Sequence, residues 1–345
     1  MRPCPPPSPS RAIGRGGQRP GAVLDVEPSG GPGAQPKVKK GPIRPIDSEV
    51  ICEPDVGGQG KMNVIGGIIV MMSCILSGFV LSGGHIGAII QPLELLVILG
   101  AAIGAFIISN PFKVIKSVLK GFGALLKGSK YKKPLYMDAL ALMYDLLTKA
   151  RKEGLMALEA DVEEPEKSAI FKKYPAIQKD HHVVDFITDY LRMMVGGNMN
   201  AIELENLMDV ELETHHEEAH QVPSAVSRIA DGLPGFGIVA AVLGIVITMS
   251  HLGGPPEELG HHVAVALVGT LLGILFAYGF FGPFSSLMEH IGRDESQFYK
   301  CLKTTIVASL QGYAPQVAVE FGRKAIFSNE RPSFKELEAH VKQKK

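Results

Sequence analysis

Four long apolar runs limit what this chain can fold into. They lie at about Asn63–Leu81, Pro92–Ser109, Leu233–Met249 and Val263–Met288. About 20 consecutive apolar residues suffice to cross a bilayer as a helix, and a helix pairs its backbone polar groups within the segment. The sequence therefore predicts an all-α membrane protein with four transmembrane helices.

The segment between the second and third runs is polar and helical in pattern. Leu140, Met143, Leu146 and Leu147 recur with the period of an α-helix, and no convincing strand alternation accompanies them. We expect five regions along the chain: an extension at 1–61, a first transmembrane hairpin at 62–110, a cytoplasmic helical domain at 111–231, a second transmembrane hairpin at 232–289 and a cytoplasmic tail at 290–345. The tail from Phe298 to Lys324 fits either an amphipathic helix at the membrane face or a flank of the helical domain.

The charges are segregated along the chain and indicate its orientation. The linkers 82–91 and 250–262 contain no Lys or Arg, whereas 111–137 holds seven Lys and no acid. Loops rich in Lys and Arg stay on the cytoplasmic side. We therefore expect the short linkers outside, the helical domain inside and both termini in the cytoplasm.

The first 61 residues differ from the rest in composition. They are rich in Pro, Gly and Arg and lack apolar periodicity, a composition that cannot bury enough surface to offset the entropy of ordering. We expect either a disordered extension or translation that truly begins at Met62, where the first apolar run opens.

A pattern of the zinc-protease type occurs in the acidic stretch before the third run. His216-Glu217-Glu218-Ala219-His220 satisfies HExxH, in which two histidines on one helix face bind zinc. An acidic run matches this pattern easily by chance, and Pro223 follows at once, where we expect the helix to end. A membrane protease is therefore the less favoured alternative, and we expect neither an enzyme nor a metal or other cofactor. The four cysteines form no CxxC pair and indicate no disulfide framework.

The third and fourth runs lack any side chain that could carry a proton. They contain no Asp, Glu, Lys, Arg or His, and their polar groups are hydroxyls such as Thr248, Thr270 and Tyr278. Hydroxyls do not titrate near neutral pH. Glu94 lies near the outer end of the second run, where an interfacial place is favoured over a pore mouth. If this chain conducts protons, another chain must therefore supply the carboxylate.

Several ordered segments resemble one family. Ala266–Pro283 is similar to the signature segment of the MotA proton-channel family, and Asp231–Gly244 to the start of its third span. Met62–Ser109, which includes Gln91–Glu94, resembles its first hairpin, and Tyr131–Pro175 its rotor-facing loop. The tail segments Gln311–Pro315, Glu320–Lys324 and Glu330–Phe334 also match.

The resemblance implies a function and roles for particular residues. MotA-like chains are stator subunits of the flagellar motor, and the family implies five copies around two MotB-type chains that supply a membrane aspartate. Arg151 and Glu159 would contact opposite charges on the rotor protein FliG. Thr270 would line the ion path, and Pro234 and Pro283 would couple ion movement to the cytoplasmic domain. The tail favours protons over sodium as the driving ion.

A second alternative is the related ExbB/TolQ type of transducer. Those relatives place one span well before a helical hairpin, whereas this chain pairs its spans two plus two around the helical domain. The layout therefore favours the MotA branch. We expect membrane lipid around the chain and no nucleic-acid partner.

Overall fold

The computed structural model describes residues 59–125, 128–197, 200–250, 253 and 255–344. The chain divides into two units, Met1–Cys52 and Glu53–Lys345, and all the described residues belong to the second. The predicted extension at 1–61 lies outside the described residues except for its last three positions. Every regular element in the described residues is helical, which confirms the all-α class.

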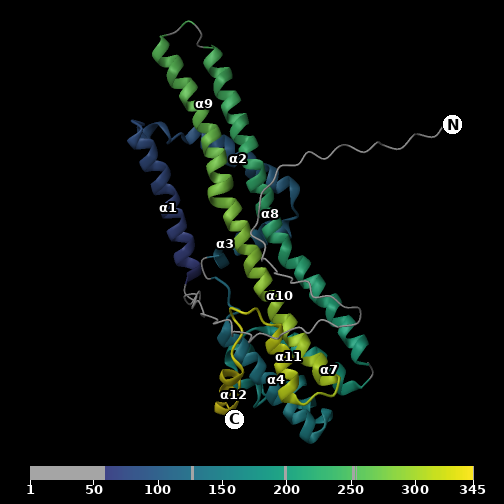
Figure 1. Cartoon of the computed structure of the whole chain (residues 1–345). Coiled ribbons are helices and arrows are strands. Elements are labelled where there is room, and N and C mark those ends of the chain that lie inside the picture. Colours follow the sequence, from purple (N-terminus) through teal and green to yellow (C-terminus); the bar gives the residue numbers. More distant parts are fainter. Residues whose placement is uncertain (1–58, 126–127, 198–199, 251–252, 254, 345) are drawn as a thin grey trace, which may run out of the picture. The chain divides into compact units, whose positions relative to one another are not determined.

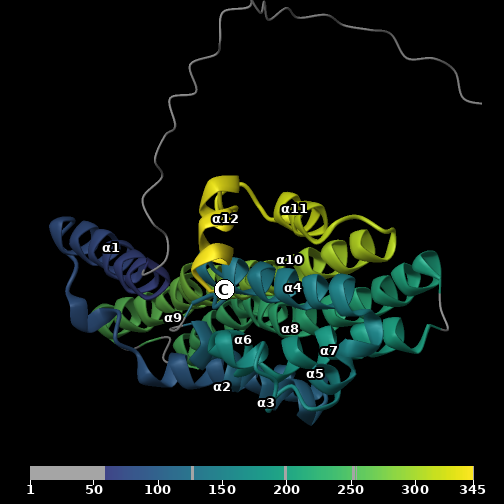
Figure 2. The ribbon, with the colours of Figure 1, turned by 90° about the horizontal axis from the view of Figure 1, so that it is seen from below.

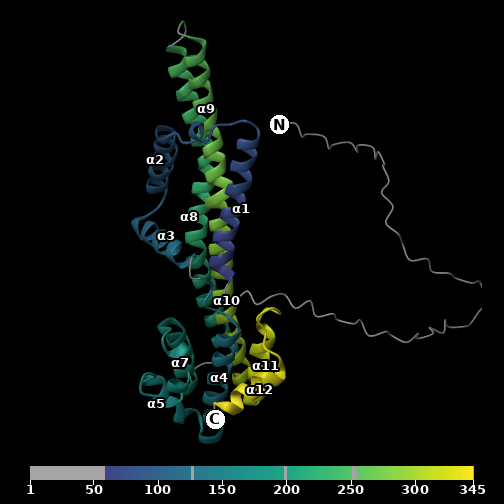
Figure 3. The same ribbon diagram turned by 90° about the vertical axis from the view of Figure 1, so that its left-hand side faces the viewer.

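The first two apolar runs form separate helices. α1 spans Gln59–Leu81, a 3₁₀ turn covers Ile86–Ala88, and α2 spans Pro92–Ser109. Pro92 suits the first turn of α2, where a missing N–H costs nothing. α2 packs on α8 and α9, whereas no residue of Val64–Leu81 in α1 is buried within the chain. Figure 3 shows α2 and α1 on opposite sides of the long central helices.

The last two apolar runs belong to much longer helices. α8 runs from Ala201 to Ser250, and α9 runs from Pro256 to Phe276. A π-helical turn at Ala277–Phe281 joins α9 to α10, which spans Gly282–Leu310. Figure 1 shows α8 running beside α9 and α10. Four helices are thus long and apolar enough to cross a membrane, as predicted.

No helix end marks two of the predicted domain boundaries. α8 continues through 231–232, and α10 continues through 289–290. The same helices that form candidate spans therefore continue without a linker into the helical domain between the second and third runs, which we call the inner domain. The five predicted regions stay a prediction about where the membrane surfaces lie.

The inner domain is built around α4. Its elements are α4 (Lys133–Glu153), the 3₁₀ turns Leu155–Leu158 and Phe171–Lys173, α5 (Glu159–Glu163), α6 (Pro175–Gln178) and α7 (His181–Gly196). Leu140, Met143 and Leu146 are fully buried, as their periodicity indicates. Figure 2 shows α4 between α5–α7 on one side and the helices of the tail on the other.

The tail is a flank of this helical domain. α10 buries Phe298, Leu302 and Ile306 in the same core as α4. α11 (Pro315–Ala325) and α12 (Phe334–Gln343) then pack against α4. Of the two interpretations of Phe298–Lys324, the structure supports the one that makes it part of the inner domain.

Candidate functional sites

The membrane helices α8 and α9 approach each other closely at small residues. A Cβ added to Gly273 would lie 2.8 Å from the Cα of Gly237, and one added to Gly244 would lie 2.9 Å from the Cβ of Ala266. Small residues allow such contact in lipid, where packing rather than the hydrophobic effect joins helices. The two candidate spans therefore form one closely packed unit.

Thr270 lies on this unit. Its Cα is 3.4 Å from the position of a Cβ on Gly237, and the residue is partly exposed within the chain. Thr248 in the α8 span is buried, and its hydroxyl donates to the carbonyl of Gly244 in the same helix at 2.8 Å. Of these two threonines, only Thr270 is partly exposed.

Glu94 brings a carboxylate from α2 to the same place. Its Oε2 is buried, lies 2.9 Å from the position of a Cβ on Gly269, and has no hydrogen-bond partner among the described residues. The side chain therefore faces the α8–α9 pair rather than the surroundings. Sequence position alone, near the helix start, favoured an interfacial group and did not give this direction.

Pro234 and Pro283 stand in different backbone settings. Pro234 lies inside α8, which continues on both sides of it. Pro283 lies in the first turn of α10, directly after the π-helical turn. A proline removes a backbone donor and crowds the preceding turn, and a wider turn relieves that crowding. Gly279 in this π turn also meets α1, because a Cβ there would lie 2.7 Å from the sulfur of Met71.

The expectation that the helix ends at Pro223 is wrong. α8 passes through Pro223, which is buried. The hydroxyl of Ser285 on α10 donates to the carbonyl of Pro223 at 2.8 Å. Packing on α10 and this hydrogen bond hold the helix together where local sequence favours a break. Ser285 was not identified from the sequence, since a serine in an apolar run has many roles.

Arg151 and Glu159 lie at one exposed end of the inner domain. Arg151 is in the last turn of α4, Glu159 opens α5, and the turn Leu155–Leu158 joins the two helices. Both charged side chains are exposed, and neither has an ion pair among the described residues. Met156 is 65% exposed between them. We call Arg151, Met156 and Glu159 the inner-domain tip.

Buried groups hold the tip in place. Leu158 is fully buried beneath it. The buried carboxylate of Asp161 accepts from Lys149 Nζ at 2.7 Å and from Ser168 Oγ at 2.5 Å. A half-buried ion pair with a second hydrogen bond is more rigid than a surface pair. The tip charges therefore stand on a fixed base.

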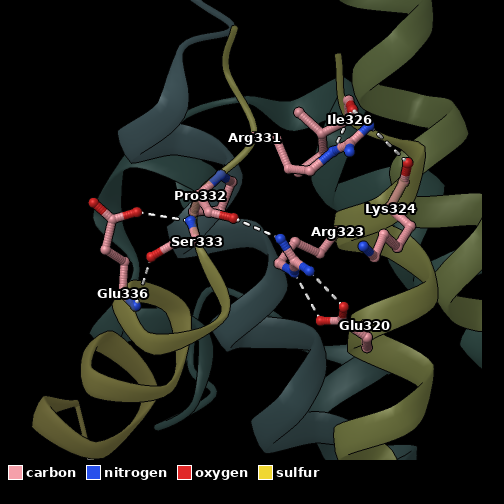
Figure 4. A network of polar contacts seen from close by, with 8 residues as sticks. All are labelled: Glu320, Arg323, Lys324, Ile326, Arg331, Pro332, Ser333 and Glu336. Atoms are coloured by element: carbon pink, nitrogen blue, oxygen red, sulfur yellow. Dashed lines mark hydrogen bonds and ion pairs between the residues drawn. The ribbon is translucent and has the colours of Figure 1, made fainter. Parts of the chain in front are cut away.

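Two of the three tail segments singled out in the sequence, Glu320–Lys324 and Glu330–Phe334, meet each other (Figure 4). Arg323 is 8% exposed, and its guanidinium donates two hydrogen bonds to the Glu320 carboxylate and one to the carbonyl of Pro332 at 2.9 Å. The Arg323 guanidinium lowers the pKa of Glu320. Ser333 and Glu336 form a capping box at the start of α12.

The capping box also ties α12 to α4. Lys133 Nζ lies 3.0 Å from Glu336 Oε1, and the Lys133 backbone N–H donates to Glu330 Oε2 at 2.7 Å. The hydrogen bond from the Ser333 backbone and that from Lys133 lower the pKa of Glu336 to about 2. These contacts give the tail a structural role.

The HExxH histidines do not converge on a metal site. His216 Nδ1 lies 3.3 Å from Ser296 Oγ of α10. Across the part of the chain that the structure describes, no three His, Cys, Asp or Glu side chains are placed to hold a metal ion. The protease alternative therefore has no geometric support at these residues.

Comparison with known proteins gives a consistent result. The model of the motility protein A N-terminal region matches residues 65–154, and that of the MotA/TolQ/ExbB proton channel family matches residues 178–300. Motility protein A of Salmonella typhimurium is 47% identical over 281 residues, which cover 81% of this chain and 95% of that protein. Chemotaxis protein LafT of Vibrio parahaemolyticus is 39% identical and covers 79% of this chain and 95% of its own length.

Solved structures share the fold. The Bacillus subtilis flagellar MotAB stator complex has a chain with a TM-score of 0.61 and 28% identity, covering 74% of this chain and 92% of that one. A chain of Campylobacter jejuni MotAB has a TM-score of 0.66 at 21% identity, over 79% of this chain and 98% of that one. The resemblance stated from the sequence is confirmed. The chain belongs to the motility protein A family, within the MotA/TolQ/ExbB proton channels.

Proposed function

We propose that this chain is a stator subunit of the bacterial flagellar motor. With a MotB-type partner it forms a proton channel that converts ion-motive force into torque and so drives motility and chemotaxis. Family membership supports this, as do solved relatives described as MotAB stator complexes. It is a transporting and force-transmitting protein rather than an enzyme.

The composition of the α8 and α9 spans supports separate roles for this chain and its MotB-type partner. The α8 and α9 spans pack through glycines and alanines and hold hydroxyls, but they contain no carboxylate. A proton path needs a group that titrates at depth. The MotB-type partner supplies this group as an aspartate, Thr270 lines the path beside it, and Glu94 lies against the same packed unit.

Pro234 and Pro283 couple the path to the inner domain. Each lies where a continuous helix passes from a span into the inner domain, so a small change at the proline tilts the helix beyond it. Both helices end in the core that carries α4. Protonation of the partner's aspartate would therefore reach the inner domain through α8 and α10.

The inner-domain tip is the surface that meets the rotor. Arg151 and Glu159 contact opposite charges on FliG, and exposed Met156 lies between them. The fixed base of the tip, through Asp161, suits a surface that must transmit force. The partners are thus FliG, two MotB-type chains and four further copies of this chain, all within the inner-membrane lipid.

The orientation follows from charge. The lysines after α2 stay in the cytoplasm, which places the inner domain and both termini there. Swimming assays test the proposed function: this gene, expressed with its neighbouring MotB-type gene, should restore motility to a bacterium lacking its own stator. Normal assembly without motility would contradict the proposal.

A further inference from the structure

The short helix α3 (Phe112–Leu125) presents a stripe of positive charge. Lys113, Lys116 and Lys120 are spaced by three and four residues, so they lie on one face of the helix, and all three are exposed. No acid occurs between 111 and 137. Within the described residues none of the three lysines has an ion pair. We call these three residues the lysine stripe.

Large apolar side chains border the lysine stripe. Phe112 is 85% exposed and Leu119 is 71% exposed, and their spacing of seven residues places them on one side of α3. Ile108, near the end of α2, is 88% exposed. Such exposure is unfavourable in water, and it suits acyl chains.

The backbone places α3 directly after a candidate span. α2 is a candidate span that ends at Ser109, and α3 begins three residues later. The opposite face of α3 is held by the protein, since Val118 and Leu125 pack against Val226 of α8 and Met288 of α10. Aromatic rings of Phe122 and Phe284 also meet edge to face, with centroids 5.9 Å apart. The lysine stripe therefore faces away from the rest of the protein, close to the end of the candidate span α2.

A small hollow lies beside the first lysine. Its volume is about 180 Å³, and it is lined by Lys113 and Ser117 of α3 with Glu218 and Gln221 of α8. Glu218 lowers the positive potential at Lys113, so Lys116 and Lys120 carry most of the attraction for an anion. Each Lys near an anionic bilayer surface contributes about 1 kcal/mol of attraction.

We propose that α3 binds anionic phospholipid headgroups through the lysine stripe while Phe112 and Leu119 enter the acyl region. Lysine side chains bury their carbon stems and hold the ammonium groups at the headgroup level. Anionic lipid bound at α3 would hold this helix against Val226 of α8 and Met288 of α10, the two helices of the proposed coupling. The inference concerns a lipid site and is independent of rotor binding.

A tryptophan reporter tests the proposal, because the chain contains no Trp. The full-length Leu119→Trp chain is reconstituted in phosphatidylcholine vesicles with about 20% phosphatidylglycerol, and bromine is placed on the acyl chains of one lipid at a time. We expect quenching by brominated phosphatidylglycerol to exceed its share of the lipid by about three-fold or more. High salt should reduce this excess, because it screens exposed charges.

Two triple variants decide the result. Replacing Lys113, Lys116 and Lys120 by Gln should remove the excess. The matched control replaces three exposed lysines of the inner domain and tail, Lys172, Lys179 and Lys335, by Gln and should leave it unchanged. Quenching in proportion to lipid composition, or equal loss in both triple variants, would overturn the proposal. Phe112→Trp serves as a second reporter if Leu119→Trp disturbs reconstitution.

Discussion

Gly273 of α9 lies against Gly237 of α8 so closely that a Cβ on Gly273 would sit 2.8 Å from the Gly237 Cα. The contact is backbone to backbone, so no side chain can yield to an added methyl group. The spacing of the two membrane helices that line the proposed path is therefore set by the absence of two side chains.

Gly273→Ala should part these helices. We expect a loss of about 1–3 kcal/mol in stability from the forced separation, together with reduced swimming. Gly235→Ala is the matched control on α8, since a Cβ there meets nothing within 4 Å, and it should be neutral or slightly stabilising. Thermal unfolding in detergent and swimming speed measure both. Equal effects of the two substitutions would show that helix contact is not what matters.

Arg151→Glu should impair torque while leaving membrane assembly intact, because the side chain is exposed and has no ion pair in the described structure. A charge-reversed FliG should partly restore rotation. Lys172→Glu makes the same change in charge at another exposed position and should have little effect. If Arg151→Glu with Glu159→Lys left motility untouched, the assignment of the inner-domain tip to the rotor would be wrong.

Arg323→Ala should release α12 from α11. The change leaves the Pro332 carbonyl and the Glu320 carboxylate without their buried partner, at a cost of about 2–4 kcal/mol. Backbone amides of α12 should then exchange hydrogen faster. Arg331 is a useful comparison: it donates to the Ile326 carbonyl, so Arg331→Ala should loosen the loop before α12 and disturb α12 less. Unchanged exchange of α12 in Arg323→Ala would contradict the network of Figure 4.

Acid should loosen the same region. The folded-state pKa of Glu336 is about 2, below its ordinary value of 4.5, and the pKa of Glu320 is also lowered. Because both pKa values are depressed, the stabilisation from both carboxylates is full above about pH 4.5 and declines below it, and that from Glu336 is lost as pH falls towards 2. Hydrogen exchange of α12, corrected for the intrinsic rate, should rise across this window. Glu336→Gln should show a smaller rise with acid, and an equal rise would rule out this carboxylate as a source.

The spans and the helical class could be predicted because lipid imposes length and apolar composition on single segments. The inner core was predictable at Leu140 and Met143 for a similar reason, since helical periodicity is local. What could not be predicted depends on contacts between distant segments. Pro223 continues a helix because Ser285 and the packing of α10 support it, and neither is visible in the sequence around Pro223.

The candidate sites show the same division. The lack of a carboxylate in the last two spans is a property of composition and was predictable. The inward direction of Glu94 and the meeting of Arg323 with Pro332 needed three-dimensional placement. The roles of Arg151, Glu159, Thr270, Pro234 and Pro283 came from resemblance to a family, and they stay predictions.

Proton conductance tests the central claim most directly. Cells expressing this chain alone should keep their cytoplasmic pH on external acidification, because α8 and α9 contain no titratable side chain in their spans. Co-expression with a MotB-type partner that has a membrane aspartate and no plug segment should acidify the cytoplasm, and an Asp→Asn change in that partner should abolish the effect. Robust conductance by this chain without any partner would contradict the account.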